Sequence, residues 1–150
     1  MKESRTTILF QELEAVSKND AAYQTFLDKH KDEKNFLSLY DFLTDYLAQN
    51  SDITTSEIIL HSNLSSNYVY PILNGKREHP SKYKLIALCI GARMNLKETQ
   101  RALSLAGCAS LHPKIPADAG IIICINDGCH SVMEVEEFLL KNNVDSPFIY

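Results

Sequence analysis

The side chains best suited to chemistry are short hydroxyl, amide and cationic groups near the middle of the 150-residue chain. Ser65, Ser66 and Asn67 follow one another, and Lys76 and Arg77 come shortly after them. Groups of these types hydrogen-bond to phosphate oxygens and to the edges of nucleic-acid bases. The residue types therefore favour recognition of a nucleic acid over bond-breaking catalysis.

Groups typical of catalytic or metal sites do not cluster along the sequence. Cys124, Cys129 and His130 lack the second pair of ligands that a structural zinc site needs, and Cys124 belongs to an apolar run. The carboxylates between residues 134 and 137 fit a solvated helix face, and no glycine-rich phosphate loop occurs. We therefore expect no catalytic residues, no metal and no cofactor, and we expect that the chain is not an enzyme.

Charge is unevenly distributed along a chain whose formal net charge is -4. Residues 51–107 contain seven Lys and Arg against four Asp and Glu, or +3, whereas residues 108–150 contain two against six, or -4. The middle segment is thus the part that best suits a polyanion. No apolar run approaches the roughly 20 residues of a membrane span, and no secretory signal precedes the first helix. We therefore expect a cytoplasmic protein with no membrane contact.

Helical periodicity dominates the sequence, and no alternating strand pattern persists. We predict an all-α fold of nine short helices. Residues 1–35 form an N-terminal helical extension, residues 36–107 the central domain, and residues 108–150 a C-terminal helical pair and tail packed with that domain. The predicted helices lie near residues 8–16, 20–27, 36–49, 55–61, 66–73, 82–90, 96–106, 117–126 and 132–141.

The central domain carries the clearest start and stop signals. Thr54 with Glu57 fits a capping box at the start of a short helix, and Ser65 is the cap of the next helix. Asn74-Gly75 ends that second helix. Two short helices joined by a turn place the second helix where it can enter the major groove, which is about 12 Å wide.

Proline and aromatic residues in the second helix are unusual for this purpose. Pro71 removes one helical hydrogen bond and disfavours helical geometry at Tyr70, which predicts a kink or a helix broken into two turns. Tyr68 and Tyr70 are bulky for groups that read a groove. Glu78 also adds a negative charge to the exit loop.

The segments Ile53–Ile59, Leu64–Val69 and Ile72–Arg77 resemble the phage-repressor-like (XRE) helix-turn-helix family. The resemblance runs without a gap from Leu39 to about Leu105, and the full chain is similar to bacterial XRE-type regulators of about this length. It implies a lambda-repressor-like helix-turn-helix core with extra helices at both ends. It also implies that Ser65, Ser66 and Asn67 contact bases and phosphates, while Val69 and Ile72 anchor the recognition helix.

The function expected from these observations is that of a DNA-binding transcriptional regulator with its recognition helix at about Ser66–Leu73. The expected base-reading residues are Ser66, Asn67 and Tyr70. The expected phosphate contacts are Thr55, Ser56, Ser65, Lys76, Arg77 and Lys82. We expect a homodimer that reads two half-sites of double-stranded DNA roughly 34 Å apart.

A second interpretation is a protein-interaction adaptor that kept the repressor-like fold and lost sequence-specific DNA binding. Pro71 and the acidic flanking segments favour it. Tyr68 and Tyr70 would then be an exposed aromatic pair that anchors a regulatory protein partner, since tyrosine is enriched at interface hot spots.

Overall fold

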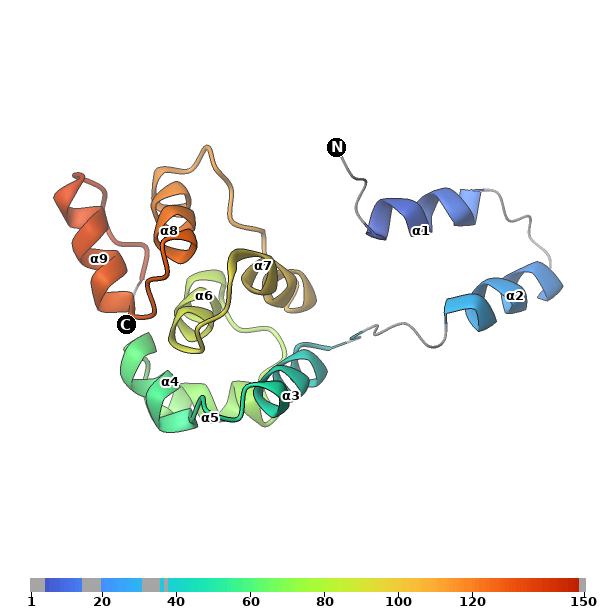
Figure 1. Cartoon of the computed structure of the whole chain (residues 1–150), viewed down its shortest axis with the longest axis horizontal. Coiled ribbons are helices and arrows are strands. Elements are labelled where there is room, and N and C mark those ends of the chain that lie inside the picture. The colour runs from blue at the N-terminus through green and yellow to red at the C-terminus, as the bar shows by residue number, and fades with distance from the viewer. Residues whose placement is uncertain (1–4, 15–19, 31–35, 37, 149–150) are drawn as a thin grey trace. The chain divides into compact units, whose positions relative to one another are not determined.

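The computed structural model describes residues 5–14, 20–30, 36 and 38–148. The chain divides into two compact units, residues 1–35 and residues 36–150. In the first unit, α1 spans Arg5–Glu14 and α2 spans Asp20–His30 (Figure 1). The first predicted helix extends to Val16, which lies outside the described residues. The structure also does not describe the side chains of Leu9, Leu13 and Asp20.

The second unit consists of seven helices within the described residues, and no strand occurs there. The prediction of an all-α chain is therefore confirmed at this level. The helices are α3 (Leu39–Gln49), α4 (Thr55–Ser62), α5 (Ser66–Leu73), α6 (Lys82–Gly91), α7 (Leu96–Leu105), α8 (Pro116–Asn126) and α9 (Val132–Lys141).

Local capping explains where several helices begin. The Ser38 hydroxyl accepts a hydrogen bond from the Asp41 amide at 3.1 Å, so α3 begins at Leu39 rather than at the predicted Phe36. Asn95 and Glu98 form a reciprocal capping box at the start of α7, with bonds of 2.8 and 2.9 Å. Capping residues at both positions satisfy amides that the first helical turn leaves free.

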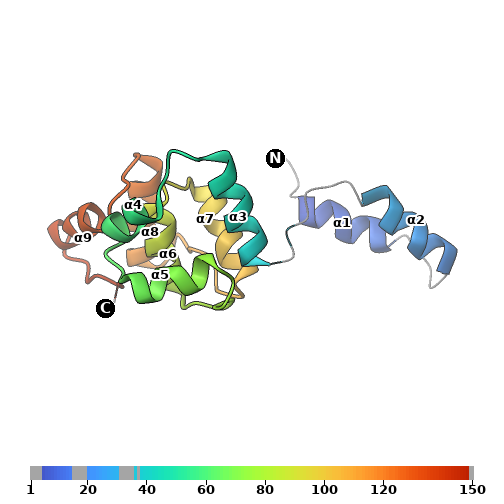
Figure 2. The ribbon, with the colours of Figure 1, turned by 90° about the horizontal axis from the view of Figure 1, so that it is seen from below.

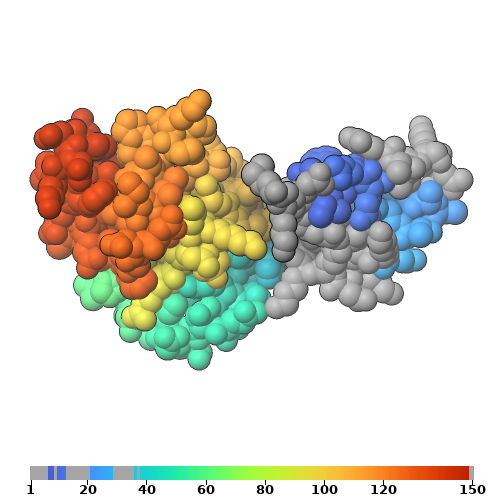
Figure 3. Space-filling view, turned by 45° about the horizontal axis from the view of Figure 1, so that its top comes forward, coloured from blue at the N-terminus to red at the C-terminus, as the bar shows by residue number. Residues whose placement is uncertain are grey.

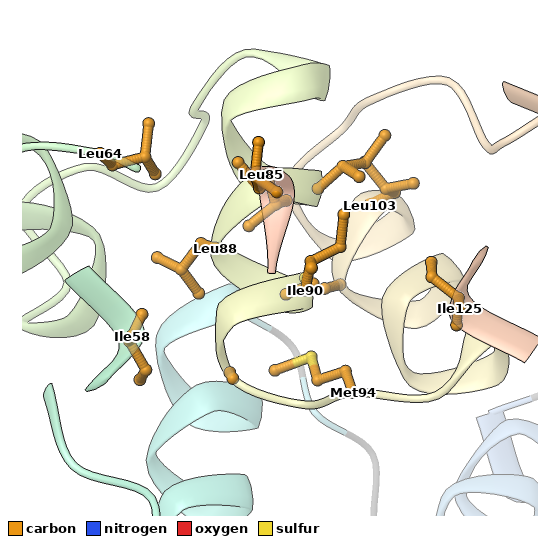
Figure 4. Packing of buried hydrophobic residues seen from close by; sticks show 14 of the residues in the cluster. Ile58, Leu64, Leu85, Leu88, Ile90, Met94, Leu103 and Ile125 are labelled. Atoms are coloured by element: carbon orange, nitrogen blue, oxygen red, sulfur yellow. The ribbon is translucent and has the colours of Figure 1, made fainter. Parts of the chain in front are cut away.

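Helix α6 is the centre of the hydrophobic core. Every residue from Leu85 to Gly91 is buried, because α4 covers one side of the helix and α7 another (Figure 1). Ile58 of α4 and Leu103 of α7 both lie among the buried side chains of α6 in Figure 4. Deleting one such aliphatic side chain typically costs about 2–5 kcal/mol, so α6 fixes the positions of the helices around it.

Gly91 lets α4 and α6 approach closely. A Cβ atom at this position would lie 2.8 Å from the Ile58 carbonyl oxygen and 3.0 Å from the Ser62 nitrogen. These are backbone atoms that cannot rotate away. The sequence at residue 91 therefore helps to set the spacing between α4 and the core.

The C-terminal helices belong to the same compact unit as the central helices. α8 packs against α7, and α9 packs against α8, α4 and α6. In Figure 3 the red segment that contains α9 lies against the orange segment that contains α8, and the orange segment lies directly against the yellow segment of the central helices. Phe148 in the tail is buried, and its ring meets the Tyr83 ring edge-on at 6.4 Å.

Candidate nucleic-acid interface

A tight turn joins α4 to α5. Asn63 adopts the left-handed conformation with φ of 60°, which ends α4, and Leu64 then turns into the core. The buried Ser62 hydroxyl accepts a hydrogen bond from the Leu64 amide at 3.2 Å, which fixes the turn. The two helices run in different directions on either side of this turn (Figures 1 and 2).

Helix α5 has one buried face and one exposed face. Val69 and Ile72 are almost completely buried, as the family resemblance implied. Ser66 and Asn67 are exposed in the first turn, and Tyr70 is 52% exposed one turn further along. The three expected base-reading residues thus all lie on solvent-accessible parts of the same short helix.

Pro71 does not break α5. The helix runs continuously from Ser66 to Leu73, so the predicted division into two turns is wrong. Proline cannot donate a hydrogen bond to the Asn67 carbonyl, but its own carbonyl accepts one from the Arg77 amide at 2.9 Å. Burial of Val69 and Ile72 on either side of Pro71 stabilises a helix that its local sequence disfavours.

The loop after α5 presents two cations. Gly75 adopts φ of 85° against the Tyr40 ring, where a Cβ atom would lie 3.1 Å from Cγ. The Lys76 amide donates to the Asn74 side-chain oxygen at 3.0 Å. These contacts fix the backbone while the side chains of Lys76 and Arg77 are exposed.

Tyr68 lies between two cations. The Arg77 guanidinium carbon is 4.6 Å from the centroid of the Tyr68 ring, and Lys84 Nζ is 4.3 Å from it. Both distances suit cation–π attraction. Tyr68 is only partly exposed, so the prediction of an exposed aromatic pair holds for Tyr70 and is wrong for Tyr68.

Lys82 is engaged by a buried carboxylate. Its Nζ donates to Asp118 Oδ2 at 2.8 Å and to the Ser110 carbonyl at 3.2 Å. Asp118 is completely buried, and it also accepts hydrogen bonds from Tyr83 Oη at 2.8 Å and from the His112 amide at 2.9 Å. The positive charge of Lys82, which was expected to contact a phosphate, is thus paired with a carboxylate of the protein itself.

The ionisation of this cluster follows from its contacts. Burial disfavours the charged form of Asp118, but hydrogen bonds from Lys82, His112 and Tyr83 outweigh that penalty and hold its pKa below the usual range. Burial, together with the hydrogen bond to Asp118, raises the pKa of Tyr83 to about 12. Asp118 is therefore an anion at neutral pH, and it fastens α8 to the start of α6.

The first turn of α4 is exposed at Ser56 and partly exposed at Thr55. The Thr54 hydroxyl accepts from the Glu57 amide at 3.2 Å, which forms half of the predicted capping box. The Glu57 carboxylate instead accepts from Arg93 at 3.4 Å. Arg93 therefore offsets the negative charge nearest to the amides of this turn.

Sequence reasoning missed Asp118 and Arg93 as determinants of this surface. Each acts on a residue 36 positions away, Asp118 on Lys82 and Arg93 on Glu57. No local pattern reports such a pairing. One usable signal was a single aspartate in the first turn of an otherwise apolar helix, because a buried charge needs a partner.

The described residues form neither a metal site nor a disulfide. No group of three His, Cys, Asp or Glu side chains there is placed to hold a metal ion, and all four cysteines are free thiols. Within the same residues, no helix has both the length and the apolar character needed to cross a membrane. Comparison with known proteins found no matching family model, no matching curated protein and no matching solved structure.

Proposed function

We propose that this chain is a DNA-binding transcriptional regulator that uses α4 and α5 as a helix-turn-helix. The observation that carries this proposal is the placement of Ser66, Asn67 and Tyr70 on the exposed side of α5 while Val69 and Ile72 hold the opposite side in the core. A short helix anchored in this way presents polar side chains to a groove at fixed positions.

Two further surfaces support the assignment. Thr55 and Ser56 open α4, where free amides and the helix dipole favour a phosphate. Lys76 and Arg77 project from the loop at the other end of α5. In the proposed complex, these groups hold the two phosphate strands that border the groove, and Ser65 contacts a phosphate beside the start of α5.

We also propose that the core of the second unit has a lambda-repressor-like fold. Helices α3 to α7 are five short helices in sequence, with the turn between the second and third of them, as in that fold. A single module of this size contacts few base pairs. We therefore infer a homodimer on two half-sites, with centres roughly 34 Å apart.

The salt dependence of DNA binding tests the proposal. Each phosphate contact releases condensed cations, so affinity for duplex DNA falls steeply as salt rises, with a logarithmic slope of about -0.9 per phosphate. A Lys76→Ala, Arg77→Ala double variant should bind more weakly and show a shallower slope than the unaltered protein. Binding that is absent or independent of salt would exclude the proposed function.

The adaptor interpretation is favoured by one observation. Tyr70 is 52% exposed and Leu60 of α4 is 72% exposed, and aromatic residues such as tyrosine are enriched at protein interfaces. A Lys76→Ala, Arg77→Ala double variant separates the two functions, because Tyr70 has a role in both. An adaptor would keep its protein partner in the double variant and lose it on Tyr70→Ala, whereas a DNA-binding regulator would lose affinity for DNA in the double variant.

A further inference from the structure

A pocket of about 240 Å³ lies where the turn between α4 and α5 meets α6. Its walls come from Asn63, Leu64 and Ser65 of the turn, Tyr68 of α5 and Lys84 of α6. Pockets for drug-sized molecules usually have volumes of about 300–1,000 Å³. This pocket therefore suits a small group rather than a whole cofactor.

The pocket has a cationic wall, and the residues that line it include no acidic side chain. Lys84 Nζ lies over the Tyr68 ring, and Arg77 approaches the same ring. Among the residues that the structure describes, neither cation forms an ion pair with a carboxylate, whereas Lys82 is paired with Asp118. Lys84, the cation among the lining residues, thus has no internal counter-ion and attracts an external anion.

The turn side of the pocket offers hydrogen-bonding groups. Ser65 precedes α5 but makes no capping hydrogen bond, in contrast to Thr54 before α4 and Asn95 before α7. Its hydroxyl is therefore available to another acceptor. Asn63 is held in a left-handed conformation at the rim and contributes an exposed amide side chain.

We propose that this pocket binds one phosphate group, held by the Lys84 ammonium and the Ser65 hydroxyl, with Tyr68 keeping Lys84 in place. In the DNA complex that group is a backbone phosphodiester beside the start of α5, and this source of the phosphate rests on the proposed function. Lys84 is thus a phosphate contact, while Lys82 serves the protein's own structure.

Four variants test the pocket in the 150-residue protein. Lys84→Gln removes the charge, Lys84→Arg keeps it, and Tyr68→Leu removes the ring that holds it. Lys141→Gln on α9 removes an exposed charge that does not line the pocket. Thermal melting of each variant verifies that it folds, so that a change in binding is not mistaken for unfolding.

The first readout is the salt slope of binding to a duplex chosen by selection. Losing one phosphate contact reduces the steepness of the salt slope by about 0.9. The slopes of Lys84→Gln and Tyr68→Leu should therefore both be shallower by about that amount. Lys84→Arg and Lys141→Gln should keep the slope of the unaltered protein. An unchanged slope in folded Lys84→Gln would overturn the phosphate site while leaving the proposed function intact.

A second readout locates the phosphate. Duplexes with a single neutral methylphosphonate should include one position that weakens the unaltered protein but has no effect on Lys84→Gln. If every position weakens both proteins equally, the site is overturned. If the unaltered protein binds no DNA, the proposed function fails. Inorganic phosphate then tests whether the pocket binds a phosphate group. At equal ionic strength, the unaltered protein should be more stable in phosphate than in chloride, and Lys84→Gln should not show this difference. That result would support the site, and the absence of the difference in the unaltered protein would overturn it.

Discussion

The Lys82 ammonium and the Asp118 carboxylate form an ion pair of 2.8 Å between the first turn of α6 and the first turn of α8. The carboxylate is fully buried and the lysine side chain is 16% exposed, so water screens the pair poorly. This pair links α8 directly to α6 within one compact unit.

Replacing Asp118 with alanine should therefore be strongly destabilising. It leaves the Lys82 charge and the Tyr83 hydroxyl without their partner, and removing one member of a buried pair typically costs about 3–5 kcal/mol. The free energy of unfolding from urea titration measures this loss. Asp145→Ala in the exposed tail is the matched control and should change stability little. Equal stability of the two variants would contradict the proposed anchoring role.

The same carboxylate predicts a pH dependence. The pKa of Asp118 is lowered from 3.8 in the folded protein, so its ionised form contributes stability above that value. This contribution is lost as the pH falls through the lowered pKa. The difference in unfolding free energy between the unaltered protein and Asp118→Asn should therefore be largest near neutral pH and shrink in acid. A difference that grows on acidification would be inconsistent with an ionised Asp118.

Gly75 and Gly128 provide a matched pair for testing the loop after α5. Both have φ of 85°, but a Cβ atom at Gly75 would meet the Tyr40 ring, whereas one at Gly128 has nothing within 4 Å. An alanine at either position should lose about 1–2 kcal/mol from left-handed strain. Gly75→Ala should cost more than Gly128→Ala in thermal or urea unfolding. If both cost the same, the contact with Tyr40 contributes nothing.

Pro71→Ala should stabilise the protein. Alanine restores the amide that can donate to the Asn67 carbonyl, and proline in a helix interior costs about 3 kcal/mol, of which part is recovered in a short helix. The carbonyl at this position still accepts the Arg77 amide. Thermal unfolding should show a raised Tm, while a lowered Tm would mean that the proline ring packs better than the structure indicates.

Arg93→Ala should weaken DNA binding without contact between Arg93 and DNA. Its removal leaves the Glu57 charge unopposed in the first turn of α4, where a phosphate is proposed to bind. Charge effects at a helix terminus amount to about 0.3–1 kcal/mol, or roughly a two- to fivefold loss of affinity. An added Glu57→Gln change should restore binding. Failure of this rescue would place the effect of Arg93 elsewhere.

The sequence predicts the helices of the second unit well because their signals are local. Ser38, Asn95 and Gly75 act on neighbours within a few residues, and the apolar spacing of α3 and α7 shows which face is buried. The error at Phe36 arose because an apolar residue extended the pattern beyond the true cap. The prediction of a broken helix at Pro71 was wrong because burial of Val69 and Ile72 in the core overrides the local effect of the proline.

The candidate site is only partly readable from the sequence. Exposure of Ser66 and Asn67 follows from the alternation of buried and exposed faces around a helix, and exposure of Lys76 follows from its place in the loop after Gly75. The difference in role between Lys82 and Lys84 cannot be read from the sequence in this way. It depends on the ion pair of Lys82 with Asp118, which lies far along the chain. Charges can be counted from a sequence, but which of them remain available to a partner is decided by tertiary contacts.

Selection of duplex DNA from a random library by the unaltered protein and by Asn67→Ala tests whether α5 reads bases. The unaltered protein should select a two-fold symmetric motif. Asn67→Ala should lose the preference at one position of each half-site and keep the others, because a base contact specifies a single position. Enrichment of no motif by the folded, unaltered protein would contradict the assignment of α5 as a recognition helix.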